Sequence, residues 1–308
     1  MHVPDGFINA QVSIGSGIVS FATLWAYVRN AKNLVADKLI ALTGMMSALI
    51  FVLQMINFPI AAGTSGHLLG GALAVIVLGP HLGIICISIV VVIQSLLFAD
   101  GGLSALGINV FNMAIVTSLV GWLLITSWKK LFGEANVSII SGSIVAGLLS
   151  VIFSSIAFVF EYALGGTVAV PLSSVLLAML STHLLIGLGE GIITALIVSL
   201  LLRVRSDLVY VKTNEHISNN TSSIYGLFIL LLLCFTLITP YASSSPDGLE
   251  SVAENFGFLE TDGLVLFLND YGISGLNNSF LSTIISAVLG IVVVVGISNV
   301  FLKFQKRT

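Results

Sequence analysis

Residues 68–98 read LLGGALAVIVLGPHLGIICISIVVVIQSLLF and contain no aspartate, glutamate, lysine or arginine. About 20 apolar residues are enough for a helix to cross the hydrocarbon core of a bilayer. This stretch is longer than one crossing needs, and Gly79, Pro80 and His81 interrupt it near its middle. It fits two helices, 68–79 and 82–98, and it also fits two half-length segments around a re-entrant turn.

The whole chain has the composition of an integral membrane protein. Of its 308 residues, 57% are hydrophobic and 8% charged, whereas about a quarter of the residues in a soluble domain are charged. This excludes an ordinary soluble enzyme, and a net charge of −3 without a basic block argues against a nucleic-acid partner. Long apolar runs predict nine membrane spans, at approximately 11–28, 39–57, 68–79, 82–98, 103–127, 137–160, 175–202, 224–240 and 281–302.

The distribution of charge decides how often the chain crosses. With the N-terminus outside and nine crossings, all 11 lysines and arginines fall in inner loops. Most acidic residues fall in outer loops, Glu161 among them, which leaves Glu190 as the acid within a span. Because cytoplasmic loops are enriched in Lys and Arg, we predict an all-α membrane protein with its N-terminus outside and its C-terminus inside. A single crossing by 68–98 would place half of the basic loops on the wrong side.

A polar stretch divides the spans into two groups. Residues 203–223 (RVRSDLVYVKTNEHISNNTSS) are predicted to form a cytoplasmic linker. A seven-helix core, residues 1–202, precedes it, and a two-helix segment, residues 224–308, follows it. The outer loop of that segment, residues 241–280, is too long for a turn, so it is either functional or loosely ordered.

The N-terminus is the first candidate for chemistry. No positively charged region precedes the first apolar run, unlike in a cleaved signal peptide, so we expect the N-terminus to survive. The free amine of Met1, the amide nitrogen of His2 and its imidazole Nδ1 can close two adjacent chelate rings on one metal ion. Such planar nitrogen sites suit Ni(II) and Cu(II), and affinity should rise with pH because the amide must lose a proton. The alternative is a frayed terminus with an ordinary polar side chain.

A second histidine is predicted to lie on the same side of the membrane. His67 stands in the glycine-rich sequence GTSGHLLGG (63–71), at the outer mouth of the third span. Glycines permit close backbone approach and unusual dihedral angles, so this loop could present an imidazole to the open corner of the chelate. The alternative is a histidine in a common type of helix-mouth turn.

Three further residues are candidates for positioning or gating roles: Asp5, His183 and Glu190. The last two stand seven residues apart in STHLLIGLGEG (181–191), which places them on one helix face about 10 Å apart. Ionisable groups at membrane depth are functional candidates, although a neutral, hydrogen-bonded pair that fixes helix packing is equally compatible. The acids of 247–270 could attract cations, but an ordinary solvated loop is the default expectation.

Three motifs of the sequence are distinctive: MHVPDGF at the N-terminus, GTSGHLLGG around His67 and HLLIGLGEG in the seventh span. They resemble the CbiM/NikM family, the substrate-capture (S) components of cobalt and nickel energy-coupling-factor transporters. This resemblance covers about residues 1–202. The sequence SSSPDGLESVAENFGF (243–258) resembles the PDGLE signature of the small CbiN/NikN-type subunit. The chain thus resembles a natural fusion of the two proteins.

The resemblance implies a site and partners. Met1, His2 and His67 would bind the Ni²⁺ or Co²⁺ that is transported, and no catalytic cofactor is expected. The chain itself lacks the GxxxxGK[ST] loop that binds ATP, so ATP would be hydrolysed by CbiO/NikO-type ATPase subunits and coupled through a CbiQ/NikQ-type transmembrane T subunit. The protein would be a multi-pass, non-enzymatic transporter subunit of a bacterial or archaeal cytoplasmic membrane, surrounded by lipid.

Three alternatives remain open at this stage. The first is a self-sufficient, proton-coupled divalent-metal transporter that uses His183 and Glu190 as a relay. The second is a scaffold that binds no metal tightly. A membrane metalloenzyme comes last, because no catalytic base is placed beside a metal site and HExxH is absent.

Overall fold

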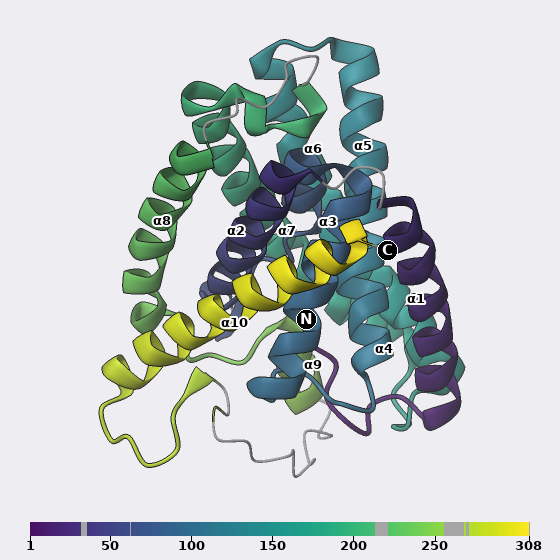
Figure 1. The fold of residues 1–308 in the computed structure, drawn as a ribbon. Coiled ribbons are helices and arrows are strands. Elements are labelled where there is room, and N and C mark those ends of the chain that lie inside the picture. Colours follow the sequence, from purple (N-terminus) through teal and green to yellow (C-terminus); the bar gives the residue numbers. More distant parts are fainter. Residues whose placement is uncertain (32–35, 62, 213–220, 256–267, 269–270, 308) are drawn as a thin grey trace.

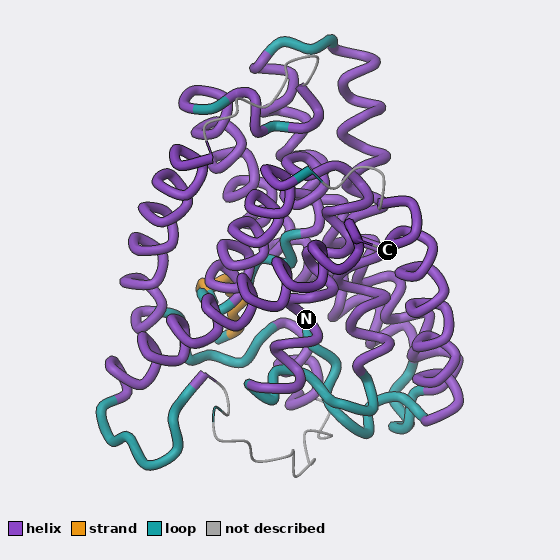
Figure 2. Tube along the Cα trace, viewed as in Figure 1, coloured by secondary structure: helices purple, strands orange, loops and turns teal. Residues whose placement is uncertain are grey.

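Figure 1 shows the helices of the computed structural model, which describes residues 1–31, 36–61, 63–212, 221–255, 268 and 271–307. Among these residues, strands are confined to one short antiparallel hairpin (Figure 2). In chain order the elements are α1 (Ala10–Ala31), α2 (Asp37–Gln54), β1 (Phe58–Ala61), β2 (Thr64–Gly66), α3 (Gly71–Leu97), α4 (Leu106–Asn109), the π-helix η2 (Val110–Val116), α5 (Thr117–Phe132), α6 (Asn136–Gly165), α7 (Leu172–Val204), the 3₁₀ turns η3 (Ser206–Leu208) and η4 (Tyr210–Lys212), α8 (Thr221–Ile238), η5 (Thr239–Tyr241), α9 (Gly248–Asn255) and α10 (Ser279–Arg307).

Eight helices of the described residues are long and apolar enough to cross a membrane. Large apolar side chains cover their outer surfaces, as in α1, where Ile18, Phe21 and Trp25 are exposed. In a bilayer such side chains face lipid, so their exposure carries no penalty. The predicted all-α membrane fold is therefore confirmed, while nine crossings and their orientation stay predictions.

Helix α3 is a hairpin rather than one straight helix. Its chain reverses at Gly79, whose φ of 78° lies in the left-handed region that favours glycine. The next residue, Pro80, suits the start of a new helix because it has no amide proton to satisfy there. A Cβ placed on Gly83 would lie 3.0 Å from the Cα of Val75, eight residues earlier, so the two arms run in close contact. The third predicted span is thus a short arm that starts at Gly71, because 68–70 belong to the preceding loop.

Glu161 departs from the prediction. It lies inside α6 with an exposed fraction of 4%, not in an outer loop, so Glu190 is not the only acid within a helical span. Its carboxylate accepts hydrogen bonds from Ser16 Oγ at 2.9 Å and Asn112 Nδ2 at 2.6 Å. The charge pattern suggested a loop at Glu161, but the apolar residues that follow extend α6 to Gly165.

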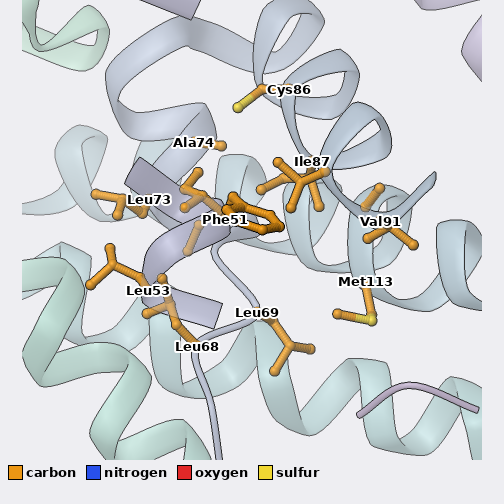
Figure 3. Close-up of a cluster of buried hydrophobic side chains, with 14 of the residues drawn as sticks. Phe51, Leu53, Leu68, Leu69, Leu73, Ala74, Cys86, Ile87, Val91 and Met113 are labelled. Atoms are coloured by element: carbon orange, nitrogen blue, oxygen red, sulfur yellow. The ribbon is translucent and has the colours of Figure 1, made fainter. Parts of the chain in front are cut away.

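The core is apolar and closely packed. In Figure 3, Phe51 lies in the middle of a buried cluster, with Leu73 and Ile87 drawn on either side of it. Elsewhere α6 and α7 pack backbone to backbone, since a Cβ on Gly147 would lie 2.8 Å from the Cα of Gly191. Close packing of this kind holds membrane helices together, because lipid removes the hydrophobic driving force between them.

The C-terminal segment packs onto the core. Helices α8 and α10 lie against α2, and the short helix α9 lies against α7, next to the N-terminus of the chain (Figure 1). The predicted division at 203–223 stays a prediction. Part of that linker, 213–220, and part of the predicted outer loop, 256–267 and 269–270, lie outside the described residues.

Asp100 and Lys129 lie at opposite ends of the bundle. Asp100 precedes the continuous helical segment 106–132, which is about 40 Å long. Lys129 lies in its last turn and donates a hydrogen bond to the carbonyl oxygen of Val211 at 2.6 Å, in the η4 turn. The end that carries Asp100 also carries the N-terminus, and it holds the residues described next.

Candidate metal centre

The first residues of the chain are buried inside the fold. Met1, His2 and Val3 have exposed fractions of 2%, 6% and 0%. Val3 is held on both sides by Asn109: its amide donates to Oδ1 at 2.7 Å, and its carbonyl oxygen accepts from Nδ2 at 3.1 Å. Asn109 ends α4 where the wider π-helix η2 begins, and irregular turns of this kind are frequent at functional sites. The terminus is a fixed part of the core rather than a frayed end.

His67 lies directly beside the N-terminal amine. The amine nitrogen of Met1 is 2.6 Å from His67 Nε2. The other ring nitrogen, Nδ1, lies 2.9 Å from the carbonyl oxygen of Leu68. A carbonyl oxygen can only accept, so Nδ1 carries the proton and Nε2 points its lone pair at the amine. Burial lowers the pKa of His67, and the nearby positive N-terminus lowers it further, which favours the neutral imidazole that metals bind.

The His2 ring stacks on the His67 ring. Their centroids are 5.2 Å apart with an interplanar angle of 20°. Nδ1 of His2 lies 2.8 Å from Asp100 Oδ1, and Nε2 lies 3.3 Å from Gln94 Oε1. Tyr271, in the C-terminal segment, donates its hydroxyl proton to Asp100 and accepts from Gln94 Nε2 at 2.9 Å. The His2 ring is therefore held at both nitrogens.

The charge of Asp100 is also set by these neighbours. Burial alone would raise the pKa of Asp100, but the adjacent His2 ring and its hydrogen bond outweigh burial and hold this pKa at about 2. Asp100 is thus a carboxylate at neutral pH. It stands beside the nitrogen of His2 that would close a chelate.

Asp247 reaches the same place from the C-terminal segment. Its Oδ2 lies 2.8 Å from the amine of Met1 and 3.7 Å from His67 Nε2. Burial would raise the pKa of Asp247, but the positive N-terminus and His67 hold it well below its usual range. Solvated acids were the default expectation for this loop, and Asp247, with an exposed fraction of 7%, does not follow it.

The PDGLE sequence builds a rigid turn around Asp247. Oδ1 of Asp247 accepts hydrogen bonds from the amides of Leu249 and Glu250 at 2.7 and 2.8 Å, while Glu250 Oε2 accepts from the amide of Asp247 at 2.9 Å. This reciprocal capping box satisfies the free amides at the start of α9. The carbonyl oxygen of Pro246 accepts from the amide of Ser65 at 2.8 Å, which ties the turn to β2.

Glu190 supports the His67 loop from within the bundle. Its two carboxylate oxygens accept hydrogen bonds from the amides of Leu69 and Gly70, at 2.6 and 2.9 Å. His183, two turns away, donates from Nδ1 to the carbonyl oxygen of Met179 at 2.8 Å, and its Nε2 has no hydrogen-bond partner in the described part of the chain. Neither residue touches the amine.

Asp5 has a structural contact of its own. Its Oδ1 accepts hydrogen bonds from the amide and the hydroxyl of Ser104, at 2.7 and 2.5 Å. This fixes the turn that follows the buried terminus.

The structure thus brings Met1, His2 and His67 together and surrounds them with groups that the sequence did not single out: Gln94, Asp100, Asn109, Asp247 and Tyr271. Within the described residues, no three His, Cys, Asp or Glu side chains form a group able to hold a metal. Met1, His2 and His67 are a different kind of candidate, because only two of their four nitrogens belong to side chains. Of these residues, Asp100 could have been noticed in the sequence, because it is the first acid after the long apolar run of 68–98.

Comparison with known proteins shows which families the two parts of the chain match. Residues 2–208 match the family described as the cobalt uptake substrate-specific transmembrane region, CbiM, and residues 221–307 match the PDGLE domain. The chain belongs to the CbiM family. The resemblance inferred from the sequence, a CbiM-type protein fused to a PDGLE segment, is confirmed.

Relatives within the CbiM family cover most of the chain. A protein of Archaeoglobus fulgidus named as a fused nickel transport protein is 31% identical over 99% of both chains. A protein of Haloquadratum walsbyi named as a metal transport protein is 38% identical over 69% of this chain and 94% of its own length. A crystal structure of a truncated transition metal transporter has a TM-score of 0.60 and 29% identity, and covers 66% of this chain and 99% of the solved one. The chain is therefore a multi-pass protein of the cell membrane in a metal-transport family.

Proposed function

We propose that this chain is the substrate-capture subunit of an ATP-driven importer for Ni²⁺ or Co²⁺. The ion would be bound by four nitrogens: the amine of Met1, the amide and imidazole of His2, and the imidazole of His67. The proposal requires a free amine on Met1 in the mature protein. The relatives named as nickel and metal transport proteins support the choice of cargo.

One distance carries the proposal. Two nitrogens on adjacent corners of a square, each about 2.0 Å from a metal, lie about 2.8 Å apart. The amine of Met1 and Nε2 of His67 lie 2.6 Å apart, and the His2 ring is stacked against His67. This separation is close to that of two neighbouring ligands at 90°, as found in planar and octahedral sites, and the set of four nitrogen donors favours Ni²⁺ over Co²⁺.

Energy would come from other proteins. Because the sequence has no P-loop, separate ATPase subunits and a transmembrane T subunit would drive delivery of the ion to the inner side. The alternative of a proton relay is weakened by Glu190, whose two oxygens both accept from main-chain amides of the His67 loop. Protonation of this carboxylate would weaken the hydrogen bonds that hold the loop.

Calorimetric titration of the purified full chain with Ni²⁺ and Co²⁺ tests the donor set. His2→Ala and His67→Ala should each abolish high-affinity binding. His81→Ala is the matched control, because His81 lies at the tip of the α3 hairpin, where its ring packs against Tyr27 with centroids 5.2 Å apart. Equal affinities of the wild-type and His2→Ala proteins would refute the proposal. Metal uptake by liposomes holding this chain alone, driven by a pH gradient, would favour the relay.

A further inference from the structure

A carboxylate of the C-terminal segment lies against two of the proposed metal donors. Asp247 Oδ2 is within 4 Å of both the amine of Met1 and Nε2 of His67, at 2.8 and 3.7 Å. These two nitrogens are themselves 2.6 Å apart. This one oxygen atom therefore lies next to both of the nitrogens that would be neighbouring ligands of the metal.

The carboxylate of Asp247 faces a positive charge both before and after the metal ion is bound. The protonated amine of Met1 carries one positive charge and is buried, and a buried charge without a partner is costly. A divalent ion that displaces protons from the amine and from the His2 amide leaves a complex that again carries one positive charge. The charge that Asp247 faces is the same in both states, so the same carboxylate can serve both.

We propose that Asp247 is a positioning residue of the metal centre: it holds the amine of Met1 beside His67 in the metal-free chain and balances the charge of the cation once bound. This inference rests on the proposed function and deepens it. The N-terminal core would then supply all four donor nitrogens, and the fused PDGLE segment would supply the carboxylate that holds the amine and balances the charge.

The fold around Asp247 supports this role. The turn is fixed by the capping box with Glu250 and by the hydrogen bond from Ser65 to Pro246. Gly248 lets α9 lie directly on α7, since a Cβ at that position would be 2.9 Å from Cδ1 of Ile186 and 3.3 Å from Cε1 of His183. The carboxylate is therefore delivered to the amine by a rigid element, as positioning of a ligand requires.

The two tasks of Asp247, capping and charge, can be separated by substitution. Asp247→Asn removes the charge and keeps a good N-cap, because Asn is as effective as Asp at that position. Asp247→Glu keeps the charge and weakens the cap. If charge matters, the Glu variant should bind Ni²⁺ more tightly than the Asn variant; if only the cap matters, the order should be reversed.

The experiment is calorimetric titration of the full chain with Ni²⁺, with an unmodified N-terminus. We expect Asp247→Asn to weaken affinity roughly 10- to 100-fold, the range typical of residues that support metal ligands. The matched control is Glu254→Gln, which makes the same change of charge at an exposed position of the same helix, α9, and should bind like the wild type. Thermal unfolding of the metal-free variants shows that each is folded.

The outcomes separate this inference from the proposed function. Wild-type affinity in Asp247→Asn, or tighter binding by the Asn variant than by the Glu variant, would overturn the role of Asp247 while a loss in His2→Ala still supports the donor set. A loss in Asp247→Asn without any loss in His2→Ala would overturn both, because the ion would then be bound elsewhere.

Discussion

Glu190 Oε2 accepts a hydrogen bond at 2.6 Å from the amide of Leu69, a residue 121 positions earlier in the chain. Its other oxygen accepts from the next amide, that of Gly70. The carboxylate thus fixes the main chain two to three residues after His67. A loop that must hold an imidazole within a few tenths of an ångström needs such a support from a rigid helix.

Glu190→Gln should therefore destabilise the protein and weaken metal binding. The amide group of Gln can accept only one of the two bonds and turns its NH₂ toward the other amide, which leaves a buried donor unsatisfied at a cost of about 1–3 kcal/mol. Thermal unfolding in detergent and Ni²⁺ titration measure the two effects. Glu134→Gln, at an exposed position in the loop before α6, is the control; equal losses in both variants would show that the Glu190 contacts have no special role.

Asn109→Ala should loosen the N-terminus. It removes both hydrogen bonds to Val3, so the amine would no longer be held at His67, and Ni²⁺ affinity should fall roughly tenfold. The buried terminus should also become accessible to an aminopeptidase. Asn136→Ala, at an exposed position where Asn136 accepts from Lys212, should change neither property. Resistance of the Asn109→Ala terminus to digestion would contradict the account of how it is held.

Gly83→Ala tests the reversal in α3. The added methyl group would lie 2.8 Å from Cγ1 of Val75 and 3.0 Å from its Cα, so the arms of the hairpin must separate, at a cost of about 1–3 kcal/mol. Gly15→Ala, where nothing lies within 4 Å of the added carbon, should leave thermal stability unchanged or slightly raised. A Gly83→Ala protein as stable as the wild type would mean that the two arms are not in contact.

Much of the fold could be predicted from composition alone. Apolar runs place helices because every backbone group in a bilayer must be satisfied within its own segment, and Gly79 with Pro80 marks the reversal in α3. Glu161 could not be placed in the same way. Its charge resembles a loop signal, and only the partners Ser16 and Asn112, from other helices, explain how it is buried.

Only those parts of the candidate site that follow from a local sequence pattern could be predicted. Met1 and His2 could be proposed because the predicted chelate is local in the chain, and His67 because glycines surround it. Asp100, Asn109 and Asp247 act through tertiary contacts that span 98 to 246 residues of sequence, and no local pattern reports such contacts. Asp247 was visible only as one of the acids of 247–270 and as part of the PDGLE sequence, and its position over the N-terminus is a property of the packed molecule.

The central claim is that the amine of Met1 is itself a metal ligand, and one titration tests it most directly. Ni²⁺ affinity is measured by calorimetry for the chain with a free amine on Met1, for the same chain with that amine acetylated, and for a chain with one glycine added before Met1. We predict high-affinity binding by the free amine and its loss in both blocked forms. Equal affinity of the free and blocked chains would contradict the account.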